Sequence, residues 1–412
     1  MRENVWALDY IASLGVDVVW ICPVYDSPQV DTGYDIPNYE DIEPPYGTLQ
    51  DMETLIREAH ARGMKIMPDL VINHTSYQYP WFQESRASKD NSKRDWYIWR
   101  PVMYSCTSQY LPPNNWRCKF GGGGVWEWDE QSGEYYLHLF AKEQPDLKWE
   151  NPVTRKAMYA SAMEIWLERG VDGRLPYRHG QMYSKPPGVP DAPELDPGAP
   201  YQMNQVLAKY GAITVGELPS TPDRARVLQY VSAEAKQLDM GFQFDVVNVG
   251  FNKPLRYDAR PKDWQLPDRL YIDFVREHRS GEGMGKALAS LAHFARDHAR
   301  VPMEAEESGK EVKGPWMKPH PLAGVLAYWR KAVLFRKEYA DLLVYGDFRT
   351  LREEDGEIYT FVKEPPSGGS AKAVVALNFT GEEKSGADPM EGRGKLRFLW
   401  GMFRIGIAPL IV

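Results

Sequence analysis

One stretch, residues 64–75, limits the fold of this chain more than any other part of the sequence. It is mainly apolar, carries a carboxylate at Asp69, and ends on an amide and an imidazole at Asn73 and His74. A strand buried on both faces needs apolar side chains along its length, and polar side chains appear where it emerges from the core. The stretch therefore predicts a buried parallel strand whose carboxyl end opens onto a functional site. An ordinary strand end followed by a turn has the same pattern.

Helical and strand patterns alternate on both sides of this stretch. Apolar residues with helical spacing are followed by short, β-branched runs, and Gly or Pro ends most of these segments. The expected elements at the start of the chain are helix 4–15, strand 16–22, helix 49–62 and strand 65–71. The same logic returns at residues 212–217, where an apolar run ends in a carboxylate. This alternation is typical of a parallel α/β fold with right-handed crossovers.

A long segment after the predicted strand has a different character. Residues 76–151 lose all periodicity and are rich in Trp, Tyr, Pro and Gly. Because a structureless loop of this length is uncommon in a compact domain, the segment predicts a small inserted subdomain. Inside it we expect a hairpin whose arms lie at residues 126–129 and 134–140.

The last part of the chain changes pattern once more. After residue 345 apolar and polar residues alternate, at residues 359–362 and 373–379 above all, which indicates an antiparallel sheet. The expected domains are an α/β domain at residues 1–75 and 152–340, an inserted subdomain at 76–151 and a C-terminal β domain at 341–412.

The composition narrows the classes of partner and compartment. The 412 residues carry a net charge of −8 and no basic block, which argues against nucleic acid and anionic membranes as partners. The three cysteines form neither a disulfide framework nor a zinc pattern, so a reducing compartment is expected. Neither a signal-peptide h-region nor an apolar run of 18 residues occurs, which predicts a cytoplasmic protein without a membrane span.

Nine stretches match one known family in that family's own order. They lie at residues 33–36, 69–76, 94–99, 112–116, 136–140, 144–147, 170–173, 214–219 and 296–300. On these residues the chain resembles the α-amylase superfamily (glycoside hydrolase family 13), in its α-glucosidase and oligo-1,6-glucosidase branch. The resemblance implies a (β/α)8 TIM-type barrel, a subdomain inserted after the third strand and a C-terminal antiparallel β domain. This agrees with the organisation that the patterns predict.

The resemblance also implies a reaction and the residues that carry it. The family hydrolyses terminal α-glucosidic bonds with retention, in which one carboxylate attacks the anomeric carbon and a Glu protonates the leaving oxygen. By position, Glu217 matches this general acid/base. The residues that match substrate-binding positions are Asp35, His74, Phe120, Phe140 and Gln144. The implied substrates are maltose-, isomaltose- or sucrose-like disaccharides and oligosaccharides. For this chain we expect neither a cofactor nor a metal ion.

Simpler explanations exist for some of these positions. Glu217 fits a surface residue at a strand end, and Phe120 and Phe140 fit packing inside the inserted subdomain. Asp69 and Asn73 fit a structural role at the strand end better than a catalytic one.

The sequence departs from the family at the position of the attacking carboxylate. In the family, Gly-Val-Asp-Gly is followed by Phe-Arg-Xaa-Asp, and the last Asp is the nucleophile. Here residues 170–173 are followed by Arg174-Leu175-Pro176-Tyr177, so no Asp stands there and Arg174 arrives one residue early. Pro176 would also remove a hydrogen-bond donor from a central strand. The late Asn-His-Asp triplet that clamps the sugar in the family has no match between residues 251 and 293.

These departures leave two interpretations of function open. The first is a retaining α-glucosidase of the named branch on an incomplete barrel. The second is a catalytically inactive sugar-binding or non-functional relative, and a local reading-frame or splicing anomaly would explain the scrambled patch. The oligomeric state and the preference among α-1,4, α-1,6 and sucrose linkages do not follow from the sequence.

Overall fold

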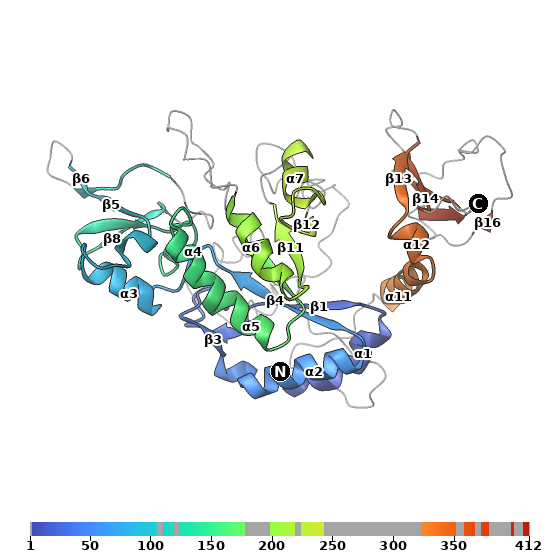
Figure 1. The fold of residues 1–412 in the computed structure, drawn as a ribbon, viewed down its shortest axis with the longest axis horizontal. Coiled ribbons are helices and arrows are strands. Elements are labelled where there is room, and N and C mark those ends of the chain that lie inside the picture. The colour runs from blue at the N-terminus through green and yellow to red at the C-terminus, as the bar shows by residue number, and fades with distance from the viewer. Residues whose placement is uncertain are drawn as a thin grey trace, which may run out of the picture. The chain divides into compact units, whose positions relative to one another are not determined.

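The computed structural model describes most of the chain in separate stretches. They are residues 2–104, 110–116, 118, 123–177, 198–218, 224–242, 323–351, 358–366, 372–378, 397–398 and 407–411. The chain divides into two units, residues 1–12 with 17–317 and residues 13–16 with 318–412 (Figure 1). Phe120 and the family stretch at residues 296–300 lie outside the described residues.

A parallel sheet of five strands forms the centre of the first unit (Figure 1). In space its order is β1 (Val18–Ile21), β4 (Lys65–Val71), β10 (Gly173–Tyr177), β11 (Ile213–Glu217) and β12 (Met240–Phe242). This is also their order in the chain, and each neighbouring pair is parallel. The helices that connect the strands are α2 (Leu49–Ala61), α4 (Pro152–Met158), the π-helical η3 (Tyr159–Glu164), α5 (Ile165–Glu168), α6 (Gly198–Ala208) and α7 (Arg224–Val231). The predicted parallel α/β organisation is confirmed.

The sheet is rolled, because side chains of its two edge strands meet on one face. The ring centroids of Trp20 on β1 and Phe242 on β12 lie 5.8 Å apart. In a flat sheet, four steps of roughly 4.8 Å would separate the two edge strands by about 19 Å. Met67 and Val215 pack together on the same inner face, beside Val18. The strands therefore curve as the wall of a β/α barrel does.

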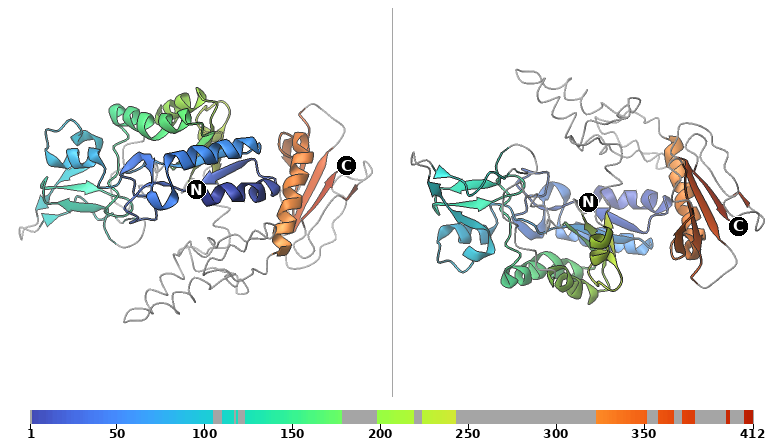
Figure 2. Two further views of the ribbon diagram at one scale, coloured as in Figure 1. Left: turned by 90° about the horizontal axis from the view of Figure 1, so that it is seen from below. Right: turned by 90° about the horizontal axis from the view of Figure 1, so that it is seen from above.

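Local sequence explains the helix that precedes β4. Thr48 and Asp51 form a capping box, in which each side chain accepts a hydrogen bond from the backbone N–H of the other. The residues that this helix, α2, buries are Met52, Leu55, Ile56 and Ala59. Helix α1 (Arg2–Ser13) lies beside α2 (Figure 2), and Arg62 donates a hydrogen bond of 2.6 Å to Asp9 of α1.

Residues 27–48, which lie between the predicted strand 16–22 and the predicted helix 49–62, contain part of a small hairpin. Strands β2 (Tyr25–Asp26) and β3 (Asn38–Ile42) pair antiparallel, and the short helix η1 (Pro44–Tyr46) follows. The prediction missed β3 because its sequence, NYEDI, has only two apolar side chains, both of which are buried. The hairpin brings together the two ends of the loop that carries Asp35.

The segment inserted after β4 forms a small α+β subdomain (Figure 2). Its elements are α3 (Pro80–Ala87), η2 (Arg94–Trp96), β5 (Trp99–Pro101), β6 (Met103–Tyr104), β7 (Tyr110–Leu111), β8 (Trp126–Asp129) and β9 (Glu134–Leu137). Strands β5, β9 and β8 make an antiparallel sheet in that order. The predicted hairpin is β8 and β9, and Gly133 in its turn has a left-handed φ of 66°, which glycine adopts at little cost.

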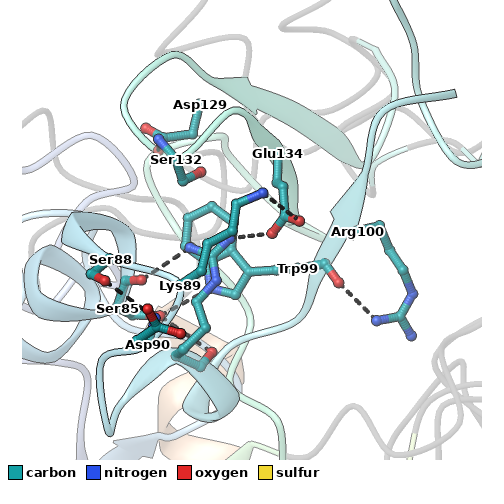
Figure 3. Close-up of polar contacts among 10 residues, drawn as sticks. Ser85, Ser88, Lys89, Asp90, Trp99, Arg100, Asp129, Ser132 and Glu134 are labelled. Carbon is teal, nitrogen blue, oxygen red and sulfur yellow. Dashed lines mark hydrogen bonds and ion pairs between the residues drawn. The ribbon is translucent and has the colours of Figure 1, made fainter. Parts of the chain in front are cut away.

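A charged cluster lies beside the aromatic residues of this subdomain (Figure 3). The Arg94 guanidinium lies 3.8 Å from the centre of the Trp99 ring and donates to the carbonyl of Ser85 at 3.0 Å. It also pairs with Glu134, whose other oxygen lies 3.0 Å from Lys89 Nζ. Burial alone would raise the pKa of Glu134, but hydrogen bonds from Lys89 and Arg94 outweigh it and hold that pKa below its usual value.

The second unit contains an antiparallel sheet beside two helices. The helices are α11 (Ala323–Glu338) and α12 (Ala340–Leu343), and the strand order is β13 (Asp347–Thr350), β14 (Ile358–Glu364), β15 (Ala373–Asn378), β17 (Ile407–Ile411) and β16 (Arg397–Phe398). The expected alternation therefore corresponds to real strands, while the boundaries of the three expected domains stay a prediction. Among the residues that the structure describes, no helix is both long and apolar enough to cross a membrane.

Removing the Glu134 carboxylate should destabilise the chain more than removing its exposed partner. Glu134→Ala leaves the Arg94 side chain, which is 12% exposed, without its carboxylate, so we expect unfolding free energy to fall by about 2 kcal/mol. Lys89→Ala removes a side chain that is 57% exposed and should cost less than about 0.5 kcal/mol. Urea unfolding of both variants beside the wild type measures the difference. Equal losses of unfolding free energy in the two variants would contradict the interpretation that Arg94 is the main partner of Glu134.

Candidate functional site

The candidate site lies where β4 leaves the sheet. Thr75 N donates a hydrogen bond of 3.2 Å to Pro145 O, and His74 lies opposite Asp146 in a short antiparallel pairing. This pairing holds Gln144 against the end of β4, although some 70 residues separate the two segments in the chain. The inserted subdomain therefore returns to the strand from which it starts.

Aromatic side chains cap the carbonyl groups at this end of β4. The bonds run from Tyr25 Oη to Asp69 O at 2.8 Å, from Tyr39 Oη to Val71 O at 2.8 Å and from Trp149 Nε1 to Ile72 O at 2.7 Å. A buried carbonyl that loses its donor costs about 1–3 kcal/mol. These bonds therefore stabilise the course of the backbone into His74.

His74 is at the centre of the site and is 2% exposed. Its Nε2 lies 3.0 Å from the carbonyl oxygen of Tyr34 and 3.0 Å from Nε2 of Gln144. Its ring centroid lies 5.3 Å from that of Phe140. Three of the predicted substrate-binding residues, His74, Phe140 and Gln144, thus lie together.

The neighbours of His74 decide where its proton sits. The amide of Gln144 is oriented by Ala141 N–H, which donates to Gln144 Oε1 at 2.9 Å, so Gln144 Nε2 is a donor. The Tyr34 carbonyl only accepts, so His74 Nε2 satisfies one of these two neighbours at a time. His74 Nδ1 is buried and has no hydrogen-bond partner among the described residues. A buried N–H without an acceptor is costly, so the favoured neutral form carries its proton on Nε2 and donates to Tyr34.

Burial keeps this imidazole neutral. It lowers the pKa of His74 from 6.5 to about 4, against smaller opposing effects of the Tyr34 carbonyl and the Asp35 carboxylate. The lone pair of Nδ1 is therefore available to accept a hydrogen bond at neutral pH.

Gln144 connects His74 to the loop that carries Asp35. Its Nε2 donates to Asp31 Oδ2 at 3.1 Å, and the backbone N–H of Asp31 donates to Asp35 Oδ1 at 3.1 Å. Asp35, the fourth described residue of the predicted binding set, is thus connected to the other three through Asp31. Asp31 was not predicted, and neither was the carbonyl of Tyr34.

Asp35 organises its own loop and is 0% exposed. Its carboxylate accepts hydrogen bonds from Ser27 Oγ at 2.9 Å, Val30 N at 3.0 Å and Asp31 N at 3.1 Å. An ionised carboxylate offers about four acceptor sites, so one of them is left for a further donor such as a hydroxyl. The predicted binding residue is therefore also the main structural support of this loop.

The loop carries backbone strain that these hydrogen bonds offset. Gln29 has φ of 62° and Thr32 has φ of 48°, both in the left-handed region. A β-branched residue such as Thr32 is a rare occupant of that region, at a cost of about 1–3 kcal/mol. Strain of this kind is common where a loop serves a ligand.

Glu217 stands at the carboxyl end of β11, on the inner face of the rolled sheet. Paired residues in neighbouring strands face the same side, and Glu217 pairs with Phe242, whose ring approaches Trp20 on that side. Asp69 of β4 belongs to the same face, because it lies two residues from Met67. Active sites of β/α barrels lie at this end of the strands. Glu217 is partly exposed and lies on β11, whereas His74 follows the end of β4.

Strand β10 forms despite the scrambled sequence, and it has no carboxylate at its carboxyl end. Its first two residues, Gly173 and Arg174, pair with β11. Its last three, residues 175–177, pair with β4. Counted from Gly170, the eighth position, where the family has its nucleophile, is Tyr177. Tyr177 pairs with Val71 of β4.

The nearest upstream carboxylate, Asp172, lies at the opposite end of the strand. Its Oδ2 accepts hydrogen bonds from Ile66 N at the start of β4, at 2.9 Å, and lies 2.7 Å from Nε2 of His60. Asp172 therefore fixes the amino ends of β4 and β10 and does not stand at the position where the family has its nucleophile. Within the described part of the chain, no group of three His, Cys, Asp or Glu side chains is arranged to hold a metal ion.

Comparisons with known proteins agree with this geometry. Residues 5–273 match the family model described as the alpha amylase catalytic domain. An alpha-glucosidase of Candida albicans is 34% identical, over 94% of this chain and 89% of its own length. An oligo-1,6-glucosidase of Parageobacillus thermoglucosidasius is 33% identical, over 92% and 86%. The first alignment runs over 514 residues, more than the 412 of this chain, so it includes positions that this chain lacks.

Solved structures with the same fold include enzymes that act on disaccharides. A mutant trehalose-6-phosphate hydrolase of Bacillus licheniformis has a TM-score of 0.77 at 26% identity, and the alignment covers 100% of this chain and 94% of that one. A mutant isomaltulose synthase of Erwinia rhapontici, solved with its natural substrate sucrose, has a TM-score of 0.75 at 25% identity, covering 99% and 94%.

Acid should destabilise the protein through His74. The unfolded imidazole binds its proton near pH 6.5 and the folded one only near 4, so protonation favours unfolding between these values. We expect a loss of about 3 kcal/mol in unfolding free energy between pH 8 and pH 4 from this group. Urea unfolding across that range should give a flatter profile for His74→Gln.

His138 provides the matched control for this experiment. Burial also lowers its pKa, in the same direction, and its Nδ1 lies 3.0 Å from the carbonyl of Phe140. His138→Gln should therefore flatten the profile less than His74→Gln does. A pH profile that His74→Gln leaves unchanged would contradict the neutral, buried imidazole.

Proposed function

Because the chain belongs to the alpha-amylase family, we propose that it recognises the terminal glucose unit of α-glucosides and acts in the retaining hydrolysis of that bond. Maltose-, isomaltose- and sucrose-like sugars are the substrate class. Relatives named alpha-glucosidase and oligo-1,6-glucosidase, at 32–34% identity over most of the chain, support this class.

One observation carries the proposal, namely the buried Nδ1 of His74, which has no hydrogen-bond partner among the described residues. Nδ1 is a neutral acceptor, and the Phe140 ring and the Gln144 amide stand beside the same imidazole. A glucose unit presents hydroxyl donors and an apolar ring face, which such an arrangement matches. Asp35 retains an acceptor site for another hydroxyl, so these four residues form a half-site for one sugar ring.

Glu217 has the role of general acid/base in this proposal. It would donate a proton to the leaving oxygen and then take one from the attacking water. Retention also requires a nucleophilic carboxylate about 5–5.5 Å from the acid. Phe120 also belongs to the proposed binding set, and it lies outside the described residues.

A second candidate function is sugar binding without hydrolysis, and a specific observation favours it. Tyr177 stands at the position of the nucleophile, and Asp172 is bonded at the other end of the strand. Loss of a nucleophile in other hydrolases lowers the rate by several orders of magnitude. If this second function is correct, the half-site binds glucose, no covalent glycosyl intermediate forms, and Glu217 has no catalytic role.

Two substrates and one isosteric variant separate these candidates. If the chain hydrolyses α-glucosides, Glu217→Gln should lower kcat/KM on maltose by about 10²- to 10⁴-fold, because the sugar leaving group needs a proton. The loss in kcat/KM on p-nitrophenyl α-glucoside should be smaller, since this ratio reports the first step and p-nitrophenolate leaves without a proton. Initial rates on both substrates measure the difference.

Calorimetry with D-glucose tests the half-site in either case. The wild type should bind glucose, and Gln144→Ala should weaken that binding about tenfold, equal to about 1.4 kcal/mol. Binding without turnover on either substrate would establish the second candidate. A wild type that neither binds glucose nor turns over a substrate would contradict both.

A further inference from the structure

Two tyrosine hydroxyls connect the inserted subdomain to the two segments that form the half-site. Tyr97 Oη lies 2.8 Å from Thr75 Oγ1, beside His74. Tyr136 Oη donates to the carbonyl of Lys142 at 2.7 Å, two residues before Gln144. Both tyrosines are buried, at 2% and 8% exposure.

The rings of these tyrosines belong to a single aromatic cluster. Phe82 of α3 lies at its centre, with ring centroids 5.0 Å from Tyr97 and 5.1 Å from Tyr136. Trp99 stacks on Phe82 at 5.5 Å and meets Tyr136 edge-on at 5.7 Å. Because such clusters pack at high density, the positions of the two hydroxyls are fixed relative to each other.

The two bonds act on opposite sides of the pairing that forms the site. One holds the segment after β4, which carries His74, and the other holds the turn that carries Gln144. The turn is small, since Gln144 N donates to Ala141 O at 2.9 Å and the Gln144 side chain accepts from Ala141 N. A shift of Lys142 therefore moves the Gln144 amide relative to the imidazole.

We propose that Tyr97 and Tyr136 are positioning residues, whose hydroxyls set the separation between His74 and Gln144 for sugar binding. The proposal rests on the proposed function for its sugar-binding part. Packing alone does not require these hydroxyls, since phenylalanine supplies the same ring. A hydroxyl is expensive to bury unless it is hydrogen-bonded, so its presence in this cluster indicates that the bonds it makes are needed.

Tyr135 offers a matched control on the same strand. It precedes Tyr136 in β9, so its side chain lies on the other face of the sheet, against Trp128 at 5.2 Å. It is as buried as Tyr136, at 7% exposure. Tyr135→Phe deletes the same atom from a ring that does not contact the half-site turn.

The test compares Tyr97→Phe, Tyr136→Phe and Tyr135→Phe in the full chain. The readouts are the affinity for D-glucose by calorimetry and the ¹⁵N shifts and titration midpoint of the His74 imidazole by NMR. We expect Tyr97→Phe and Tyr136→Phe to weaken glucose binding about three- to tenfold and to shift the His74 resonances, with its midpoint moving from about 4 towards 6.5. Tyr135→Phe should leave both readouts at their wild-type values.

A double-mutant cycle separates positioning from general stability. Thr75→Val removes the Tyr97 bond from the other side, so Thr75→Val combined with Tyr97→Phe should perturb His74 no more than either change alone. This second variant also serves if Tyr97→Phe fails to fold. Additive effects on the His74 resonances would overturn the proposal for Tyr97.

The experiment distinguishes a failure of the proposed function from a failure of the positioning role. If the wild type does not bind glucose, the proposed function fails, and the His74 resonances still decide the positioning role. Wild-type resonances in both Tyr97→Phe and Tyr136→Phe would overturn the positioning role even where glucose binds. Equal effects of Tyr135→Phe would overturn it as well, because they would show a loss of stability without a specific link to the site.

Discussion

The end of β4 depends on hydrogen-bond donors that no neighbouring strand supplies. The pairing of β1 with β4 ends at Pro68, and the two carbonyls that follow on that side are those of Asp69 and Val71. The hydroxyls of Tyr25 and Tyr39 take the place of a ladder partner there. Without them two buried carbonyls would lose their donors, at about 1–3 kcal/mol each. Because the Tyr25 and Tyr39 hydroxyls satisfy these carbonyls, β4 can end inside the core and the chain can turn into His74.

The same logic explains the use of aromatic residues in this chain. The sequence contains 24 Tyr and 14 Trp. Several of them combine a packed ring with a polar atom that bonds a backbone carbonyl, as Trp166 Nε1 does to Tyr39 O at 2.7 Å. Tyr136 does so for Lys142. Irregular backbone around the site is thus stabilised from inside the core, where water does not reach it.

The sequence predicts the parts of the fold and site that have their own side-chain pattern. Strand β4 begins and ends at the predicted residues, because burial on both faces leaves a long apolar run. Asp35, His74, Phe140 and Gln144 were found by motif, and they lie together. The contacts that join them were not predictable, since the Tyr34 carbonyl is a backbone group and the orientation of the Gln144 amide follows from a local turn. The roles of these residues in binding stay predictions.

Binding and bond cleavage make different demands on this chain. Recognition of a neutral sugar needs donors and acceptors held in place, and the neutral state of the buried His74 imidazole is compatible with the proposed binding role. Retaining hydrolysis needs in addition a second carboxylate near Glu217, at the carboxyl ends of the strands. Asp172 lies five residues before Tyr177, which is about 16 Å along a strand, and it is bonded to Ile66 at the amino end. The altered sequence of β10 therefore bears on the proposed cleavage, while the residues of the proposed half-site lie on other segments of the chain.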